Sequence, residues 1–283
     1  MLHLAIAGSD KTPLPPADLP LLQEALGKVG IETSVQSWDN PEADWTSADA
    51  VLIGPTWDYH ENHENFVAWV EQVSGQNKLF NPNNLVIWNS RKTYLTDLEV
   101  GGAPIIPTVQ IRQGSAFRLK SIFEALSTDK IVMKPQIGAS AIHTHVISAK
   151  DEELYQSLKN DHAMLAQPYV ESIETRGEVS LTMMNGVFSH SVIKVAKEGD
   201  FRIQQEHGGQ VLPYEATDRE RELGEMLMFM LPVTPLYARI DFVNIDDEPK
   251  LMELELIEPD LHLRYDESSA DRFARAIKLR MEH

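Results

Sequence analysis

The chain has 283 residues, 42% of them hydrophobic, with no cysteine and a formal net charge of −18 at pH 7. The length suits one large or two small globular units, and the lack of cysteine excludes disulfides, a thiolate nucleophile and a cysteine zinc site and favours a cytoplasmic protein. The negative charge argues against general binding of nucleic acid, the apolar runs are too short for a membrane helix, and the N-terminus lacks the basic start of a signal peptide.

The first ninety residues alternate short apolar runs with helical patterns. Strands are predicted at residues 4–7, 31–38 and 50–54, and helices at 18–29 and around 66–73. Strand–helix–strand order with short loops predicts a small parallel α/β sheet. Because no G-x-G-x-x-G follows a strand, the classical dinucleotide-binding fold is excluded.

The middle of the chain continues with helices and short strands. Asn89-Ser90 can cap a helix that runs to residue 100, and Pro104 and Pro107 enclose a short predicted strand. A helix near 122–126, a strand at 130–134, a helix at 151–160 and a strand at 164–167 follow.

Two hairpins and a final helix complete the chain. Residues 178–194 form the clearest hairpin, because Asn185-Gly186 tolerates the positive φ angles of a type I′ turn. Residues 237–245 and 250–257 form a second hairpin around residues 246–249, and a helix covers residues 268–281. The order predicts an α/β protein with α+β character in its later part.

Acidic residues gather on the second predicted hairpin. Strict alternation puts Glu253 and Glu255 on one strand face, and Asp241 lies in the partner strand. A three- or five-residue loop would place Asp241 opposite one of them, whereas a four-residue loop would not. Converging carboxylates repel each other unless a cation lies among them, and oxygen donors without His or Cys favour Mg²⁺ or Mn²⁺. The alternative is an exposed acidic strand face without metal.

Two lysines are candidates for binding phosphate. Lys134 ends a predicted strand and precedes a small-residue loop with Gly138, whose backbone amides can hold phosphate. Lys92 is predicted to lie early in its helix, where the helix dipole disfavours a cation, so an anionic partner would explain it. The alternative for each is a surface lysine.

Together these motifs resemble those of the ATP-grasp superfamily. Segment 88–98 resembles its first ATP-lysine region, segment 130–140 its second lysine strand and loop, and segment 166–171 the hinge that pairs with adenine. Residues 239–241 and 253–255 resemble its metal-binding pair of strands, with Glu255 where many members have Asn. The resemblance covers roughly residues 85–275. It is greatest to glutathione-synthetase-like members, in particular the D-cycloserine-forming O-ureido-D-serine cyclo-ligase group, through segments 177–181, 189–190, 199–202 and 208–209.

The resemblance implies an ATP-grasp fold with several units. Residues 1–88 would form a parallel α/β pre-ATP-grasp domain, and residues 89–283 the ATP-grasp region. Within that region, residues 108–168 would form a small lid subdomain and residues 169–283 the C-terminal subdomain. The two α+β subdomains would clamp ATP between them.

The implied activity is an ATP-dependent ligase with Mg²⁺. A substrate carboxylate would become an acylphosphate, and an amine would displace the phosphate, either within one molecule or between two. Since many relatives have several glycines where this chain has only Gly138, an ATP-binding regulatory or assembly protein with reduced catalysis is the alternative. The expected partners are small-molecule carboxylate and amine substrates, with no nucleic acid and no membrane, and the chain would be a monomer or homodimer.

The resemblance also implies roles for individual residues. The metal ligands would be Asp241, Glu253 and Glu255. The ATP-binding residues would be Lys92, Lys134, Gly138, Gln167, Tyr169, Val170, Glu178 and Lys194. Arg202 and Arg239 would hold the transferred phosphoryl group and the substrate carboxylate, because a guanidinium matches both oxyanions; an ion pair with a surface acid is the alternative for Arg202. Asp58 and His60 follow a strand end, where α/β sheets bind ligands, and with Arg91 they are the expected substrate-binding residues, with a simple loop histidine as the alternative for His60.

Overall fold

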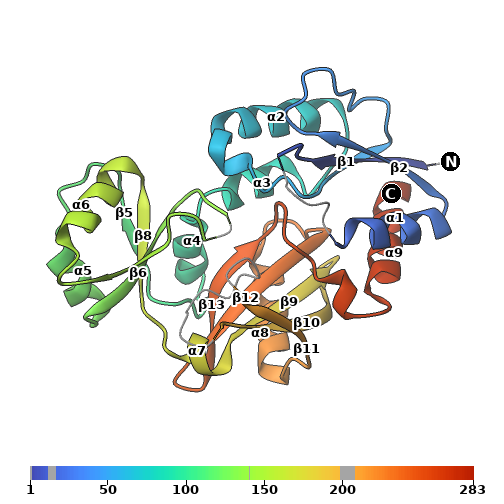
Figure 1. The fold of residues 1–283 in the computed structure, drawn as a ribbon. Coiled ribbons are helices and arrows are strands. Elements are labelled where there is room, and N and C mark those ends of the chain that lie inside the picture. The colour runs from blue at the N-terminus through green and yellow to red at the C-terminus, as the bar shows by residue number, and fades with distance from the viewer. Residues whose placement is uncertain (1, 12–16, 140, 198–207) are drawn as a thin grey trace.

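The first unit of the protein is a parallel sheet covered by helices on both faces. The computed structural model describes residues 2–11, 17–139, 141–197 and 208–283, whose strands form three sheets (Figure 1). The first sheet has the order β2-β1-β3-β4, and its pairings are all parallel. Its elements are β1 (Leu2–Gly8), α1 (Leu19–Lys28), β2 (Ile31–Ser37), β3 (Ala50–Ile53), the 3-10 turn η1 (Tyr59–Asn62), α2 (His63–Gln76), β4 (Leu79–Phe80) and α3 (Asn83–Asn89).

The alternation of β1 decides which helix covers which face of this sheet. Leu4 and Ile6 pack against α1, whereas Ala5 and Ala7 face the cluster that contains α2. Helix α1 ends at Lys28, and Gly30, with φ of 83°, turns the chain back into β2. The parallel α/β prediction for this part of the chain is confirmed.

The second sheet is a small antiparallel one, with the order β5-β8-β6-β7. It lies apart from the first sheet in Figure 1 and has two helices, α5 and α6, packed on it. Its elements are β5 (Val109–Ile111), α5 (Leu119–Leu126), β6 (Lys130–Pro135), β7 (His145–Ser148), α6 (Glu152–Asp161) and β8 (Met164–Pro168). These strands fall between residues 108 and 168, and we keep that range as the proposed lid subdomain.

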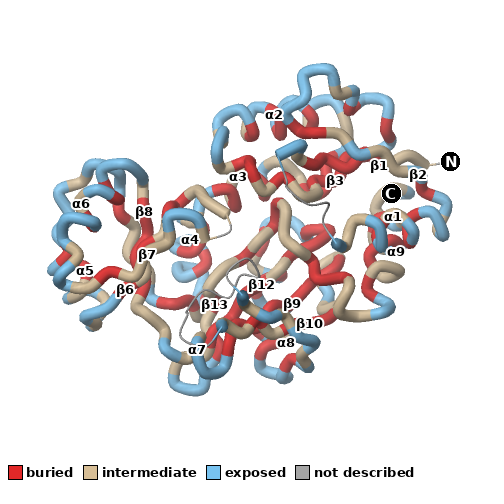
Figure 2. The backbone as a smooth tube through the Cα atoms, in the orientation of Figure 1, coloured by how far each residue is buried: buried red, intermediate tan, exposed pale blue. Residues whose placement is uncertain are grey.

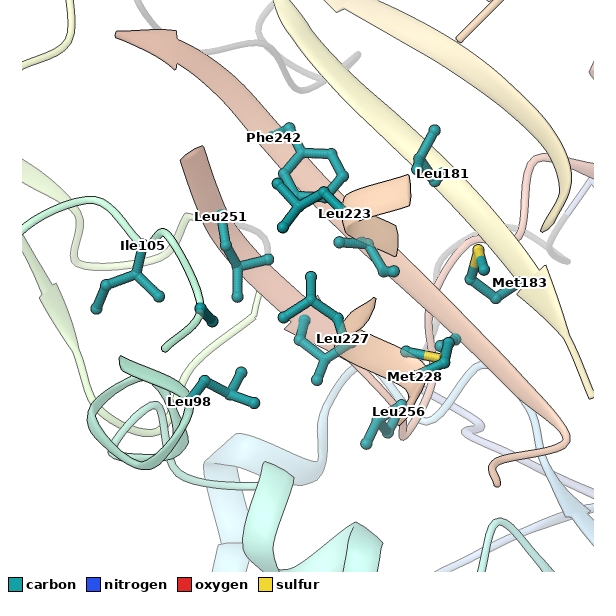
Figure 3. Packing of buried hydrophobic residues seen from close by; sticks show 14 of the residues in the cluster. Leu98, Ile105, Leu181, Met183, Leu223, Leu227, Met228, Phe242, Leu251 and Leu256 are labelled. Carbon is teal, nitrogen blue, oxygen red and sulfur yellow. The ribbon is translucent and has the colours of Figure 1, made fainter. Parts of the chain in front are cut away.

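The third sheet is antiparallel, with the order β11-β10-β9-β12-β13. Helix α8 covers one face, and Figure 3 shows Leu223, Leu227 and Met228 of this helix packed against Phe242 and Leu181 of the sheet. The other face of β12 and β13 carries the charged residues. The elements are α7 (Ser172–Arg176), β9 (Glu178–Met184), β10 (Val187–Val195), β11 (Gln210–Tyr214), α8 (Asp218–Met230), β12 (Tyr237–Ile245) and β13 (Glu248–Glu255).

The C-terminal helix joins the third unit to the first. Helix α9 (Ser269–Glu282), which follows the 3-10 turn η3 (Leu263–Tyr265), places Phe273 and Ile277 in one cluster with Leu22 of α1 and Tyr237 of β12. Figure 2 shows buried positions concentrated in the central strands of the first and third sheets. The described residues contain no helix of the length and apolarity needed to cross a membrane.

Two expected elements between residues 89 and 107 are wrong. Asn89, expected to cap a helix that runs to residue 100, instead ends α3, and the next helix, α4 (Tyr94–Val100), starts only after Thr93, its N-cap. Lys92 therefore lies in the turn before α4 rather than early in a helix. The strand expected between Pro104 and Pro107 is only an isolated bridge at Ile105, since a proline has no N–H to donate to a ladder. The regular strand β5 starts at Val109.

The two hairpin turns are both two residues long. Asn185 and Gly186 have φ angles of 50° and 76°, as predicted for the first hairpin. In the second hairpin the turn is Asp246-Asp247, with φ angles of 53° and 61°, and Glu248 already pairs with Ile245. The expected four-residue connection is therefore wrong, because both aspartates adopt the left-handed conformation that a two-residue turn requires.

Candidate functional site

A β-bulge in the second hairpin brings the acidic residues together. Since Ile245 pairs with Glu248, a regular ladder would place Met252 opposite Asp241, with Glu253 out of register. The ladder instead shifts by one residue between Asp241 and Phe242, so that Asp241 lies opposite Glu253. One face of β12 and β13 thereby carries both residues.

Arg239 lies among these carboxylates and is paired with two of them. Its Nη2 is 3.0 Å from Oδ2 of Asp241, and it also donates to Glu255. Burial alone would raise the pKa of Asp241, but Arg239 and then Lys194 hold this pKa below its usual range. Ser180 donates a further hydrogen bond of 2.5 Å to Asp241. Asp241 is thus ionised and held in place by β9, β10 and β12.

Glu255 has a different electrostatic environment from Asp241. Burial raises its pKa to about 7, Arg239 opposes this shift, and the neighbouring Glu253 and Asp241 add to it. Burial therefore disfavours the charged form of Glu255 more strongly than Arg239 stabilises it. A divalent cation would stabilise the ionised form of Glu255.

The donor set therefore fits Mg²⁺ in kind, because Asp241, Glu253 and Glu255 supply hard oxygen ligands on one face. Among the described residues, no three Asp, Glu, His or Cys side chains are grouped so that they could already hold a metal ion. Arg239 and Lys92 engage the same oxygens instead. Metal binding at this face would therefore require these cations to change partners.

Lys92 and Lys134 converge on Glu253 from outside the hairpin. Lys92 Nζ is 2.5 Å from Oε1 of Glu253, and Lys134 Nζ is 4.0 Å from Oε2. Lys92 also donates a 2.9 Å hydrogen bond to the carbonyl of Gly138, so the small-residue loop lies beside both lysines. Burial would raise the pKa of Glu253, but Lys92 and Lys134 lower it. Burial and the nearby Lys92 lower the pKa of Lys134. Two partly buried cations thus share one carboxylate.

Lys194 and Glu178 form a second buried pair next to Asp241. Their ion pair is 2.8 Å long, and Lys194 also lies 3.3 Å from Asp241. Burial raises the pKa of Glu178 to about 7, although Lys194 opposes the shift. One oxygen of Glu178 is buried without a hydrogen-bond partner among the described residues. That oxygen remains available to a ligand.

The residues expected at the adenine hinge lie where the second sheet joins the third. Gln167 is buried near the end of β8 and donates a 3.0 Å hydrogen bond to Thr108. The ring of Tyr169 lies 3.4 Å beneath the ammonium of Lys130. Val170 follows directly, half-buried, before α7. This segment links the two sheets that carry Lys134 and Glu253.

The residues expected to bind substrate in the first unit have structural contacts. Asp58 is buried and accepts a 3.0 Å hydrogen bond from the indole of Trp38, and the ring of His60 contacts the carbonyl of its neighbour Trp57. Arg91 is exposed, next to Lys92. Arg202 lies outside the described residues.

A cavity that no motif in the sequence predicts lies between the first and third units. It has a volume of about 270 Å³ and mostly apolar walls, which include Leu22, Trp57 and Phe273. Glu258, Asp260, Asp18 and Arg264 are its charged lining residues. Arg264 is paired with Asp18 at 2.9 Å and with Asp260 at 2.8 Å. The only signal in the sequence was the acidic segment Glu258-Pro259-Asp260, directly after the predicted metal-binding strand.

Glu258 is the unusual member of this group. Burial, and then the charge of Glu255, raise its pKa to about 8. Its backbone carbonyl accepts a 2.9 Å hydrogen bond from Trp57, which fixes the residue at the cavity wall. The cavity thus has apolar walls and an acidic residue, Glu258, in a different setting from its neighbours. Asp18 and Asp260 are paired with Arg264, whereas the ion pairs among the described residues include none with Glu258.

Two family models match this chain. The N-terminal domain of D-cycloserine synthetase DcsG matches residues 4–81, and the ATP-grasp domain of prokaryotic glutathione synthetase matches residues 105–260. The cycloserine biosynthesis protein DcsG of Streptomyces lavendulae is 31% identical over 289 residues, which cover 94% of each chain. These matches confirm the resemblance expected from the sequence.

Solved structures agree with the family models. The crystal structure of D-cycloserine synthetase DcsG superposes with a TM-score of 0.88 and 29% identity, over 99% of each chain. A D-alanine–D-alanine ligase from Bacillus anthracis, at 13% identity and a TM-score of 0.69, covers 100% of this chain and 97% of its own and shares the fold. The chain therefore belongs to the glutathione-synthetase-like family of ATP-grasp ligases.

Proposed function

We propose that this protein is an ATP- and Mg²⁺-dependent ligase that activates the carboxylate of an amino-acid derivative and forms a C–N bond within the same molecule. The observation that carries the proposal is the convergence of Lys92 and Lys134, from two different units, on the carboxylate face at Glu253. Partly buried lysines held by a carboxylate can exchange it for the phosphates of a nucleotide. The 31% identity to a cycloserine biosynthesis protein supports a cyclising reaction.

The nucleotide would lie between the second and third sheets. Lys92, Lys134 and the loop at Gly138 would contact the phosphates, and Gln167, Tyr169 and Val170 the adenine. Lys194 would lie on the phosphate side, and the free oxygen of Glu178 would accept a ribose hydroxyl.

The metal would be held by Asp241, Glu253 and Glu255. When bound, Mg²⁺ supplies positive charge to the phosphate oxygens as negative charge shifts in the transition state. Mn²⁺, which prefers the same oxygen donors, is the alternative ion. The carboxylates would exchange Lys92 and Arg239 for the ion, which frees both cations for the anionic substrates.

The reaction would proceed in two steps. A carboxylate oxygen of the substrate attacks the γ-phosphorus of ATP, and the bond to ADP breaks, which leaves an acylphosphate and ADP. A nitrogen of the same substrate then attacks the acyl carbon, loses its proton and expels inorganic phosphate. Arg239, and Arg202 with it, would stabilise the charge on the reacting oxygens.

The cavity of about 270 Å³ beside Glu258 would hold the substrate. Its apolar walls suit the carbon chain of a small molecule, and the carboxylate of Glu258 suits a substrate ammonium. Arg91 remains a proposed contact of the substrate. Asp58 and His60 remain proposed contacts as well, although the bond from Trp38 occupies one oxygen of Asp58.

A cytoplasmic location suits an ATP-dependent enzyme without cysteine. The proposed partners are small molecules alone, and the chain would act as a monomer or homodimer.

The test is an ADP-release assay with Mg²⁺ against amino acids and their O-ureido and γ-glutamyl derivatives, with mass detection of the product. We expect ADP release with one class of derivative and a product whose mass is lower than that of the substrate by the atoms lost in the condensation. With a chelator we expect no ADP release. Tight ATP binding without ADP release in the presence of any of these carboxylates would instead favour the nucleotide-binding regulatory protein.

A further inference from the structure

The strand that carries Glu253 and Glu255 lies at the edge of its sheet. Backbone groups of residues 104–106 bond Leu251 at this edge, but around Glu255 side chains take the place of a neighbouring strand. The outward N–H of Leu254 donates to Oη of Tyr94 at 3.0 Å. The carbonyl of Leu254 accepts from Nδ2 of Asn89 at 2.8 Å, and the N–H of Leu256 donates to Oδ1 of Asn89 at 2.8 Å. An unpaired buried edge is costly because its backbone groups would lack partners. Tyr94 and Asn89 remove that cost around Glu255.

Asn89 is the only described side chain that bonds the backbone on both sides of Glu255. It is 7% exposed, and its amide both donates and accepts, as a paired strand would. The side chains of Leu254 and Leu256 are 1% and 0% exposed on the opposite face. With the backbone clamped and these two leucines packed, the direction of Glu255 is fixed.

The same segment also places Lys92. Asn89 ends α3, Lys92 lies in the following turn, and Tyr94 begins α4. Asn89 and Tyr94 hold the β13 backbone while Lys92 reaches Glu253. A short stretch of chain therefore sets both the carboxylate face and its cation.

We propose that Asn89 is a positioning residue for the metal-binding carboxylates, and that its backbone clamp sets the affinity of this face for Mg²⁺. The inference rests on the metal role proposed above for Glu253 and Glu255. Partners that orient metal ligands from outside typically change metal affinity by roughly tenfold to a hundredfold when removed. Asn89 would act in this way through the backbone rather than through the carboxylates themselves.

Asn81 provides a matched control. It is also a buried asparagine whose amide bonds strand backbone, to the carbonyls of Tyr237 and Leu256 at 2.9 Å each and to the N–H of Leu236 at 2.6 Å. These bonds lie at the start of β12 and beyond Leu256, not on both sides of Glu255. Asn81 should therefore contribute to stability without setting the metal face.

The experiment measures the Mg²⁺ concentration needed for half-maximal binding of AMPPNP, a non-hydrolysable ATP analogue, by calorimetry. The wild type, Asn89→Ala, Asn89→Asp and Asn81→Ala are compared, with thermal unfolding of each protein without ligand. Asn89→Asp keeps the acceptor for Leu256 and loses the donor to Leu254. We expect Asn89→Ala and Asn89→Asp to need roughly tenfold or more Mg²⁺, with metal-free AMPPNP binding changed far less. Asn81→Ala should lower the unfolding temperature and leave the Mg²⁺ requirement unchanged.

The outcomes separate this inference from the proposed function. If AMPPNP binding by the wild type does not depend on Mg²⁺, the proposed metal role fails. If the wild type depends on Mg²⁺ but the Asn89 variants need the same concentration as Asn81→Ala, the positioning role fails. If both Asn89 variants fail to fold, Tyr94→Phe, which removes the acceptor for Leu254, takes their place, and an unchanged Mg²⁺ requirement in that variant overturns the inference.

Discussion

The two hairpins of the third sheet have similar turns but neutralise their charged residues in different ways. In the first hairpin, Lys194 of β10 lies directly opposite Glu178 of β9 and pairs with it at 2.8 Å. In the second, Arg239 of β12 likewise lies opposite Glu255 of β13, but Glu253 meets Lys92 and Lys134, which come from outside the hairpin. The first hairpin therefore sets its own ion pair as its strands form. The second becomes a binding site only when other parts of the chain arrive.

The positions of the two hairpins in the sheet explain this difference. Strand β9 pairs with a strand on each side, whereas the other edge of β13 has only a short bridge from Ile105 to Leu251 and the side-chain bonds of Asn89 and Tyr94 among the described residues. A strand paired on both sides is fixed by many backbone hydrogen bonds. Strand β13 instead depends on segments outside the hairpin to hold the backbone that directs Glu253 and Glu255.

The largest expected effect is at Arg239, the cation within the second hairpin. We expect Arg239→Lys to reduce turnover by roughly a hundredfold or more, because lysine cannot hold two oxyanions in one planar fork. Nucleotide affinity should fall much less, since the charge is kept. Single-turnover phosphoryl transfer at saturating Mg²⁺ and ATP measures this effect. A wild-type rate in the variant would remove Arg239 from the reacting centre.

The lysines that reach the second hairpin from outside come next. We expect Lys92→Ala and Lys134→Ala each to weaken ATP binding roughly tenfold to a hundredfold, as for the loss of one charged hydrogen bond. Lys159 is the control, because it is a buried lysine that donates to the backbone carbonyl of Ser115 at 2.7 Å. Lys159→Ala should destabilise the lid and leave ATP affinity intact in a titration. Equal affinities in all three variants would make Lys92 and Lys134 structural lysines.

A smaller effect is expected from Glu258, beyond the end of β13. Because its pKa is raised from 4.5 to about 8, the folded chain keeps a proton that the unfolded chain releases near its ordinary value. The stabilisation from this protonated group is therefore present at low pH and is lost as the pH rises toward 8. Glu258→Gln cannot titrate, so its unfolding free energy should fall less over this range, as measured by urea unfolding at a series of pH values. Parallel pH profiles for the two proteins would contradict the raised pKa of Glu258.

The smallest effect on binding is expected at the two turns. Gly186→Ala places a side chain at a φ of 76°, and its Cβ would lie 2.8 Å from Thr234, so the variant should lose about 1–2 kcal/mol of stability. Asp246→Ala, at a φ of 53°, should lose less stability than Gly186→Ala, that is, less than about 1–2 kcal/mol. If Asn89 rather than the turn positions Glu255, neither variant should change the Mg²⁺ requirement for AMPPNP binding. A changed requirement in Asp246→Ala alone would show that the turn also sets the register of the site.

Local patterns in the sequence were sufficient for much of the fold. The order of strands and helices predicts the parallel first sheet, and Asn185-Gly186 predicts the first turn. The alternation around Leu254 predicts that Glu253 and Glu255 share a face opposite the core. Each of these features depends on backbone periodicity or on the φ preference of neighbouring residues, which are properties of a few consecutive positions.

The tertiary structure alone decided how the site is assembled. The bulge at Met252 sets which residue lies opposite Asp241, and it arises from the fit of two strands rather than from either strand alone. Asn89 reads in the sequence as a helix cap, yet it bonds Leu254, which lies 165 residues further along the chain. The position of Glu258 in a cavity beside Leu22 of α1 likewise depends on how the first unit packs against the third. Such contacts form between distant segments, and their geometry follows from packing rather than from any local preference of the residues involved.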